Sequence, residues 1–302
     1  MNFTYRPVPI SAKTAIMAVI SGLLFGAVLI FATGNNPVII YAALIRGACG
    51  SLFAIASSIR WTIPLIFTGT AAAIAFKGGV FNMGVEGQMY MGGLAAAVVG
   101  ITWRELPGCL LIPLMLIASM IAEQSRLTKL IPSSSVSTAL LIGLIIVLLY
   151  QLIIRKTKFG YEFEICGINP RFARYGGVNV NKTRIGVILL SGAIAGLGGA
   201  TEIMGVRYCF ESRFVGDFAT NGILAALLGS CSPVGTLFGA AFMGFLKAGS
   251  LTVERTTSVS RAVAVVIQCT IICFVSAKSF AAILDLKGIR PGKGNTKEGK
   301  TE

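Results

Sequence analysis

Long apolar runs, separated by short polar breaks, occupy most of the chain, and each run predicts a membrane segment. A helix needs about 20 apolar residues to cross the hydrocarbon core of a bilayer. The runs cover residues 14–33, 62–76, 89–103, 108–122, 136–154, 185–206, 217–229, 236–249 and 262–284. The pattern therefore predicts an all-α, polytopic transmembrane helical bundle over residues 1–284, with about eight or nine membrane segments.

Two parts of this pattern are irregular. Residues 35–60 mix apolar residues with glycines and two arginines, which favours an interfacial segment that does not span the membrane. Pro64 is predicted to lie near the start of the next helix, where a missing N–H costs least. Residues 217–229 are too few to cross comfortably, and the sequence SCSPVG separates them from the run at 236–249. These two short pieces are predicted to form a discontinuous or re-entrant pair, a feature that often marks a transport pathway.

The composition agrees with a membrane protein. Of the 302 residues, 55% are hydrophobic and 13% are charged, and the mean hydropathy is +0.80, so the apolar surface exceeds what a soluble core of this length needs. The net charge is +14, but in a membrane chain a basic balance reports cytoplasmic loops and not nucleic-acid binding. Histidine is absent and the seven cysteines contain no C-x-x-C pair, which argues against a metalloenzyme, a hydrolase and a disulfide framework.

Basic residues predict which parts of the chain face the cytoplasm. Residues 155–184 hold seven basic residues and two acids, so the positive-inside rule places this predicted loop in the cytoplasm, together with both termini. The basic tail at 285–302 is expected to be disordered and cytoplasmic. Four crossings from an inside N-terminus return the chain to the inside near residue 123, and a fifth over 136–154 would put the basic loop outside. One crossing is therefore missing before this fifth run, or one of the first five runs does not span.

Polar side chains in apolar surroundings are the first candidates for function. Glu86 lies with Asn82 and Gln88 in a glycine-rich stretch between two apolar runs, and Glu202 lies inside a later run. A charge in hydrocarbon is expensive, so such an acid usually faces a bundle interior or a water-filled cavity. Together with Asn221, these residues are candidates to hydrogen-bond a substrate along a path. The alternatives are that they tie helices together, or that the stretch around Glu86 is a polar loop at the membrane face.

Five motifs cover most of the chain. They are PLIFTG at 64–69, GVFNMGVEGQ at 79–88, TKFGYEFEICGINPRFARYGGV at 157–178, SGAIAGLGGATEIMG at 191–205 and GILAALLGSCSPVGTLFGA at 222–240. In combination they resemble the transmembrane permeases of bacterial ABC importers. The resemblance is to the group of ribose-type and branched-chain amino-acid permeases, and within it to the branch that handles simple sugars and nucleosides.

This resemblance implies a transport subunit of the bacterial plasma (inner) membrane with no catalysis of its own. In the family, a substrate-binding lipoprotein delivers substrate outside, two permeases, identical or different, form the path, and two cytoplasmic ATPases drive alternating access. ATP then binds the partner ATPase, so no cofactor is expected on this chain. The sequence GNTKEGKT at 294–301 matches the phosphate-loop pattern, but no strand precedes it and no helix follows, so it is a chance match.

The resemblance also implies a short coupling helix, within the basic loop, that docks into a groove of the ATPase. The matching positions are Glu164, Gly167, Asn169, Pro170, Arg171, Ala173 and Arg174. The local sequence agrees, because Asn169 is a good N-cap residue and Pro170 suits the first helical position. The alternative is an ordinary solvated, charged loop.

One part of the chain departs from the family pattern. Family members carry about one further helix after the fourth run, whereas here residue 122 leads almost directly into the following loop. The charge pattern also indicates that one membrane crossing is missing in this part of the chain. Both observations predict an internal deletion or a divergent, inactive subunit. Three other hypotheses are an ion- or proton-coupled carrier that uses Glu86 or Glu202, a membrane enzyme that uses Glu86 or Asp217, and a scaffold that does not transport.

Overall fold

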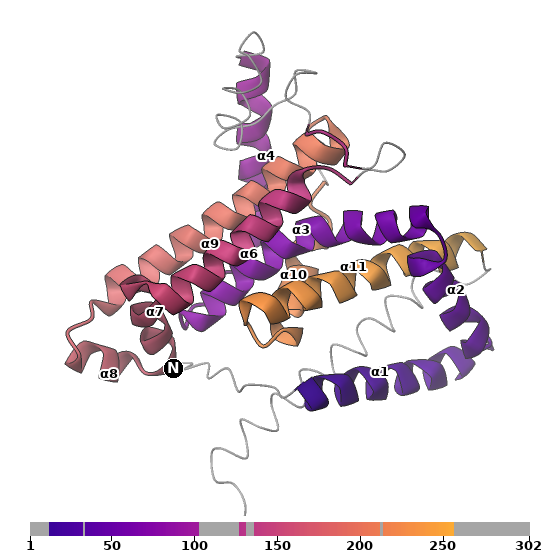
Figure 1. The fold of residues 1–302 in the computed structure, drawn as a ribbon, viewed down its shortest axis with the longest axis horizontal. Coiled ribbons are helices and arrows are strands. Elements are labelled where there is room, and N and C mark those ends of the chain that lie inside the picture. Colours follow the sequence, from indigo (N-terminus) through magenta and orange to yellow (C-terminus); the bar gives the residue numbers. More distant parts are fainter. Residues whose placement is uncertain (1–11, 33, 103–126, 131–135, 212–213, 257–302) are drawn as a thin grey trace, which may run out of the picture.

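The computed structural model describes residues 12–32, 34–102, 127–130, 136–211 and 214–256. In this part the regular structure is helical, apart from one isolated bridge between Lys129 and Ser137 (Figure 1). In chain order the helices are α1 (Ala12–Ala32), α2 (Pro37–Cys49), α3 (Leu52–Lys77), α4 (Val85–Thr102), α6 (Ala139–Lys156), α7 (Lys158–Ile168), α8 (Pro170–Tyr175), α9 (Val180–Glu202), the π-helical turn η2 (Ile203–Arg207), α10 (Phe218–Leu228) and α11 (Pro233–Thr256). The predicted all-α fold is thus confirmed for these residues.

Among the residues that the structure describes, four helices are long and apolar enough to cross a membrane. They are α3, α6, α9 with its continuation η2, and α11, which confirms the prediction of a polytopic helical membrane protein. The apolar runs at 136–154 and 185–206 correspond to α6 and to the main part of α9. The predicted runs at 108–122 and 262–284, most of the polar break between residues 123 and 135, and the basic tail lie outside the described residues.

The longest of these helices, α3, begins earlier than the sequence predicts. The prediction puts Pro64 in the first turn, but the helix begins at Leu52 and Pro64 lies inside it. The hydroxyl of Ser51 accepts a hydrogen bond from the Ala54 N–H and caps the helix. Neighbouring helices in a membrane bundle compensate for the hydrogen bond that an internal proline removes. Residues 52–60, predicted to be interfacial, therefore belong to a spanning helix.

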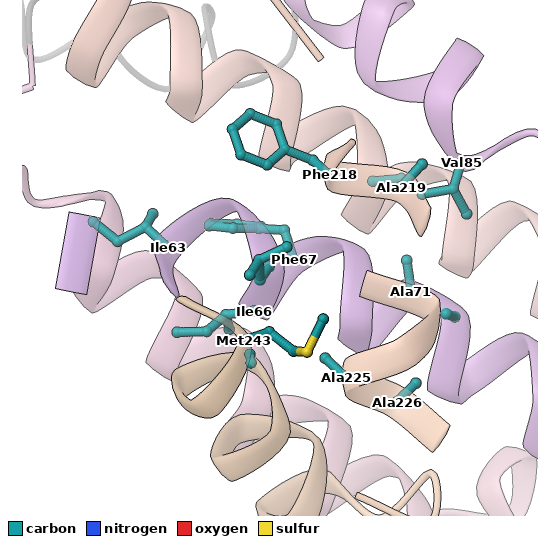
Figure 2. Close-up of a cluster of buried hydrophobic side chains, with 14 of the residues drawn as sticks. Ile63, Ile66, Phe67, Ala71, Val85, Phe218, Ala219, Ala225, Ala226 and Met243 are labelled. Carbon is teal, nitrogen blue, oxygen red and sulfur yellow. The ribbon is translucent and has the colours of Figure 1, made fainter. Parts of the chain in front are cut away.

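Helix α3 lies at the centre of the bundle and packs against α6, α9, α10 and α11 (Figure 1). Most of its side chains between Ala54 and Phe76 are buried. Figure 2 shows how Phe67 of α3 shares one apolar cluster with Ala225 of α10 and Met243 of α11. Lipid tails are as apolar as these side chains, so the hydrophobic effect does not drive helices together within a membrane. Close packing of this kind therefore helps to hold a membrane bundle together.

Helices α10 and α11 form the pair that the sequence predicts to be discontinuous. With 11 residues, α10 is as short as predicted, but α11 has 24 residues and is long enough to span, so the prediction of two short pieces is wrong for α11. The break between them is tight: Ser230 and Cys231 have left-handed φ angles of 52° and 53°. The Tyr150 hydroxyl of α6 donates a hydrogen bond to the Cys231 carbonyl at 3.0 Å. The Ser232 hydroxyl then accepts a bond from the backbone N–H of Gly235, which lets α11 start directly after the break.

Candidate functional site

Helices α7 and α8 lie at one end of the bundle, beyond the C-terminal end of α3, and together form what we call the α7–α8 unit (Figure 1). The prediction that Asn169 caps a short helix whose first residue is Pro170 is confirmed, because the Asn169 side chain accepts hydrogen bonds from the N–H groups of Arg171 and Phe172. The basic segment 155–184 is therefore helical over most of its length and not an extended loop. Its short helices hold their side chains in defined directions.

One face of the α7–α8 unit points away from the bundle. Arg171 and Arg174 are exposed, and between and beside them Phe172 and Tyr175 are 62% and 92% exposed. Ile168, at the end of α7, is exposed as well. Large apolar side chains held in the open among arginines are typical of an interface core with a basic rim. We call these residues the outer face of the unit.

The opposite face of the unit packs onto the bundle. Ala173 of α8 and Cys166 of α7 are buried with Val180 of α9 in a small apolar cluster, and Gly167 is buried next to them. Burial raises the pKa of the Cys166 thiol. Of the positions that the resemblance assigns to ATPase docking, Ala173 and Gly167 thus have no access to a partner on the outer face.

Glu164 contacts the end of α3. Its carboxylate oxygen Oε1 lies 3.1 Å from Nζ of Lys77, the last residue of α3. Gly167 approaches the same residue, because a Cβ at this glycine would lie only 1.9 Å from the Lys77 carbonyl oxygen. The matching positions therefore have different surroundings, which sequence reasoning missed: Arg171 and Arg174 lie on the outer face. Glu164 and Gly167 contact the end of α3, and Ala173 packs with Val180 of α9.

A cluster of amides joins the start of α4 to α9 and α3. The Asn82 amide donates to Gln88 Oε1 at 2.9 Å and to the Ser191 hydroxyl at 2.8 Å. That hydroxyl in turn donates to the Ala71 carbonyl at 2.8 Å. Glu86 does not join the cluster: it is exposed in the first turn of α4, where a carboxylate suits the helix N-terminus. The cluster ties helices together, and a contact of Asn82, Glu86 or Gln88 with substrate stays a prediction.

Glu202 is the centre of a charged cluster near the other end of α9. Its carboxylate lies 2.5 Å from the Arg60 guanidinium of α3 and 3.7 Å from that of Arg207. The Arg60 guanidinium also stacks 4.2 Å over the ring of Trp61, and Lys247 of α11 lies near the same ring. A buried carboxylate is stable only with partners of this kind. From the sequence alone, the rule that a buried acid needs a cation predicts a basic partner for Glu202, but it does not identify Arg60 as that partner.

The candidate path residues do not form one site. Glu202 follows Ser191, the partner of the amide cluster, by 11 residues of α9, which is about 16 Å along a helix. Asn221 is buried in a different helix, α10. A path role for Glu202 and Asn221 stays a prediction. In the part of the chain that the structure describes, no group of three His, Cys, Asp or Glu side chains is placed to hold a metal ion.

Comparison with known proteins places this arrangement among transport proteins. The family described as "Branched-chain amino acid transport system / permease component" matches residues 121–275. The nucleoside ABC transporter permease protein NupB of Lactococcus lactis is 25% identical, over 94% of this chain and 96% of NupB. The guanosine ABC transporter permease protein NupP of Bacillus subtilis is 29% identical, over 88% of this chain and 93% of NupP. The glucose ABC transporter permease protein TsgB13 of Haloferax volcanii is 26% identical, over 91% and 90%. No solved structure matches.

The same comparison reveals a difference in length. The match with NupB extends over 352 positions, whereas 94% of the 302 residues of this chain is about 284 residues. About 68 of the matched positions therefore have no counterpart in this chain. The absence of one crossing in the first half of the sequence stays a prediction.

Proposed function

This chain belongs to the family of permease components of branched-chain amino acid transport systems, and on that premise we propose that it forms the membrane path for a nucleoside or a simple sugar. It is a permease subunit of an ABC importer, a class of transporter that combines membrane subunits with an ATPase and a substrate-binding protein. The names of its relatives, which specify nucleosides, guanosine and glucose, support this range of cargo. We further propose that two such permeases, identical or different, surround one path.

The outer face of the α7–α8 unit is the observation that carries the proposed coupling. The two arginines of α8, Arg171 and Arg174, and its two aromatic residues, Phe172 and Tyr175, are all exposed. This face suits a groove that has an apolar floor and an acidic rim, because aromatic side chains then fill the floor while arginines pair with carboxylates. We assign this groove to the ATPase.

Charge supports a cytoplasmic position for the same end of the bundle. The segment 155–184 carries seven basic residues against two acids, and Lys77 lies against it. Positively charged segments next to spanning helices stay on the cytoplasmic side. Placing the unit there also puts it on the side where ATP is available, and the proposal extends to both termini of the chain.

Charge reversal on the outer face tests the docking. The amount of ATPase that co-purifies with the Arg171→Glu/Arg174→Glu variant should fall by roughly tenfold or more, because like charges across an interface cost several kcal/mol. The matched control is Lys156→Glu/Lys182→Glu, which changes the charge of the same end equally at exposed positions outside α8. If both double variants retain as much ATPase as the wild type, α8 is not the docking element.

Reconstituted transport tests the function itself. The permease, the cognate ATPase and the cognate receptor are placed in proteoliposomes, and uptake of labelled guanosine and labelled glucose is followed with and without ATP. We expect uptake of one of them to require ATP and the receptor. Uptake that is driven by membrane potential and survives without ATP would instead support an ion-coupled carrier. Absence of both uptake and receptor-stimulated ATP hydrolysis in a correctly inserted complex would reject the proposal.

A further inference from the structure

Two contacts fix the α7–α8 unit to the C-terminal end of α3. The first is the ion pair between Glu164 and Lys77, whose side chains are 41% and 16% exposed. The second is a close approach of backbones: Gly167 contacts the Lys77 carbonyl, and a Cβ at Gly79 would lie 2.9 Å from the Gly167 Cα. Gly79 itself has φ +68°, a conformation that favours glycine. Glycines therefore stand at the points where the backbone of α7 comes closest to the end of α3.

Helix α3 extends from this contact deep into the bundle. It has 26 residues, which corresponds to about 39 Å of helix. At Thr68 and Gly69 it contacts Gly222 of α10, and Gly69 also contacts Thr236, in the first turn of α11. Helix α3 therefore connects the α7–α8 unit with the helices on both sides of the α10–α11 break.

At the α10–α11 break, Ser230 and Cys231 hold left-handed backbone conformations. Such conformations are costly for residues other than glycine and persist only where the surrounding structure enforces them. The Tyr150 hydroxyl of α6 holds the Cys231 carbonyl. Helix α6 is also joined to α7, because Gly160 packs directly on the Ile153 carbonyl. Both helices that α7 contacts here, α3 and α6, thus also contact residues at or beside the α10–α11 break.

We propose that Glu164 is a positioning residue for transport: by holding Lys77 it fixes the α7–α8 unit to α3, so that a movement imposed on the unit by the ATPase is passed through α3 to the α10–α11 break. This role rests on the proposed function. It differs from the role that the family resemblance implies, in which Glu164 contacts the ATPase itself. In the structure the Glu164 carboxylate is engaged by Lys77 of its own chain, at the end of α3.

The test reverses the charge of Glu164 and then restores the pair. Glu164→Lys places two ammonium groups together, and Lys77→Glu/Glu164→Lys restores an ion pair with its charges exchanged. Glu162→Lys is the matched control, because it makes the same charge change on the same helix, where Glu162 lies 3.8 Å from the solvent-exposed Lys158. All variants are reconstituted with the ATPase and the receptor, and the ATPase retained and the substrate taken up per ATP hydrolysed are measured. A third quantity, the reaction of Cys166 with a maleimide, is measured separately.

The Cys166 measurement uses the purified permease alone, with labelling quantified by mass spectrometry of the peptide. Cys166 is buried beside Gly167, so it becomes reactive only when α7 separates from the bundle. This reading concerns the contact between α7 and α3 and does not depend on any transport activity. It therefore separates failure of this inference from failure of the proposed function.

For Glu164→Lys we expect a normal amount of retained ATPase, about tenfold less uptake per ATP hydrolysed and about tenfold faster labelling of Cys166. The exchanged pair should recover both uptake and protection, and Glu162→Lys should behave as the wild type. Loss of ATPase in proportion to the loss of uptake would overturn the inference, because Glu164 would then be a docking residue. Equal behaviour of Glu164→Lys and Glu162→Lys, or no recovery by the exchanged pair, would also overturn it. If the wild-type complex takes up no substrate, the proposed function fails and this coupling role fails with it, while Cys166 labelling still decides whether the ion pair holds α7.

Discussion

Substitution of Gly199 by alanine is expected to force α4 and α9 apart. A Cβ at Gly199 would lie 2.0 Å from the Met89 carbonyl oxygen, whereas ordinary van der Waals contact begins at 3.4 Å. The obstacle is backbone, which cannot rotate away as a side chain can. The two helices must therefore separate by about 1.4 Å at this point, the difference between those two distances. Separation of this size removes much of the attraction between atoms on the facing surfaces.

The same helix contains a matched control. Gly196 lies three residues earlier and faces the same partner, but a Cβ there would lie 3.5 Å from the Gln88 carbonyl oxygen and 3.8 Å from the Gly92 Cα. Alanine fits at this distance. Both substitutions gain the same helix propensity of about 1 kcal/mol, so their difference isolates the overpacking cost, which is about 1–3 kcal/mol. Gly199→Ala should therefore be less stable than Gly196→Ala by that amount.

Thermal unfolding in detergent provides the measurement. For a chain of this size, the expected difference corresponds to an apparent Tm of Gly199→Ala that is roughly 2–10 °C below that of Gly196→Ala. Gly92→Ala approaches the same interface from α4, where its Cβ would lie 2.1 Å from the Gly196 carbonyl oxygen, and should lower the Tm in the same way. Equal Tm values for all three variants would show that α4 and α9 are not in contact at these glycines.

Two further predictions concern the end of the bundle opposite the α7–α8 unit. Glu202→Gln leaves Arg60 without its carboxylate and should cost about 3–5 kcal/mol of stability. The control, Glu211→Gln, removes a carboxylate from an exposed pair and should cost at most about 1 kcal/mol. If unfolding curves show a larger loss of stability for Glu211→Gln than for Glu202→Gln, Glu202 is not part of a buried ion pair. In intact cells a membrane-impermeant thiol reagent should label exposed Cys209. It should not label residue 175 of a Tyr175→Cys variant in which the exposed cysteines Cys49 and Cys209 are replaced by serine, whereas the opposite pattern would place the α7–α8 unit outside the cell.

The sequence by itself determined the elements that depend on neighbouring residues. Apolar runs of sufficient length predicted the helices α6 and α9, because a spanning segment must bury its whole backbone in hydrogen bonds of its own. Asn169 followed by Pro170 predicted the start of α8, since a cap acts on the N–H groups of the next turn only. The family motifs predicted the kind of protein. None of these inferences needs to know where distant parts of the chain lie.

Only the tertiary structure decided which side chains meet. Glu202 pairs with Arg60, which lies 142 residues earlier, and Glu164 pairs with Lys77, which lies 87 residues earlier. The start of α3 was mispredicted for a related reason: Arg60 made residues 52–60 look interfacial in the sequence, and only the tertiary structure shows that Arg60 lies inside α3 and pairs with Glu202. Hydropathy reports how much of a helix leaves water, which is a local quantity. The rotation of each helix and the choice of its neighbours depend on packing among segments far apart in the chain, and these decide the division of the α7–α8 unit into two faces.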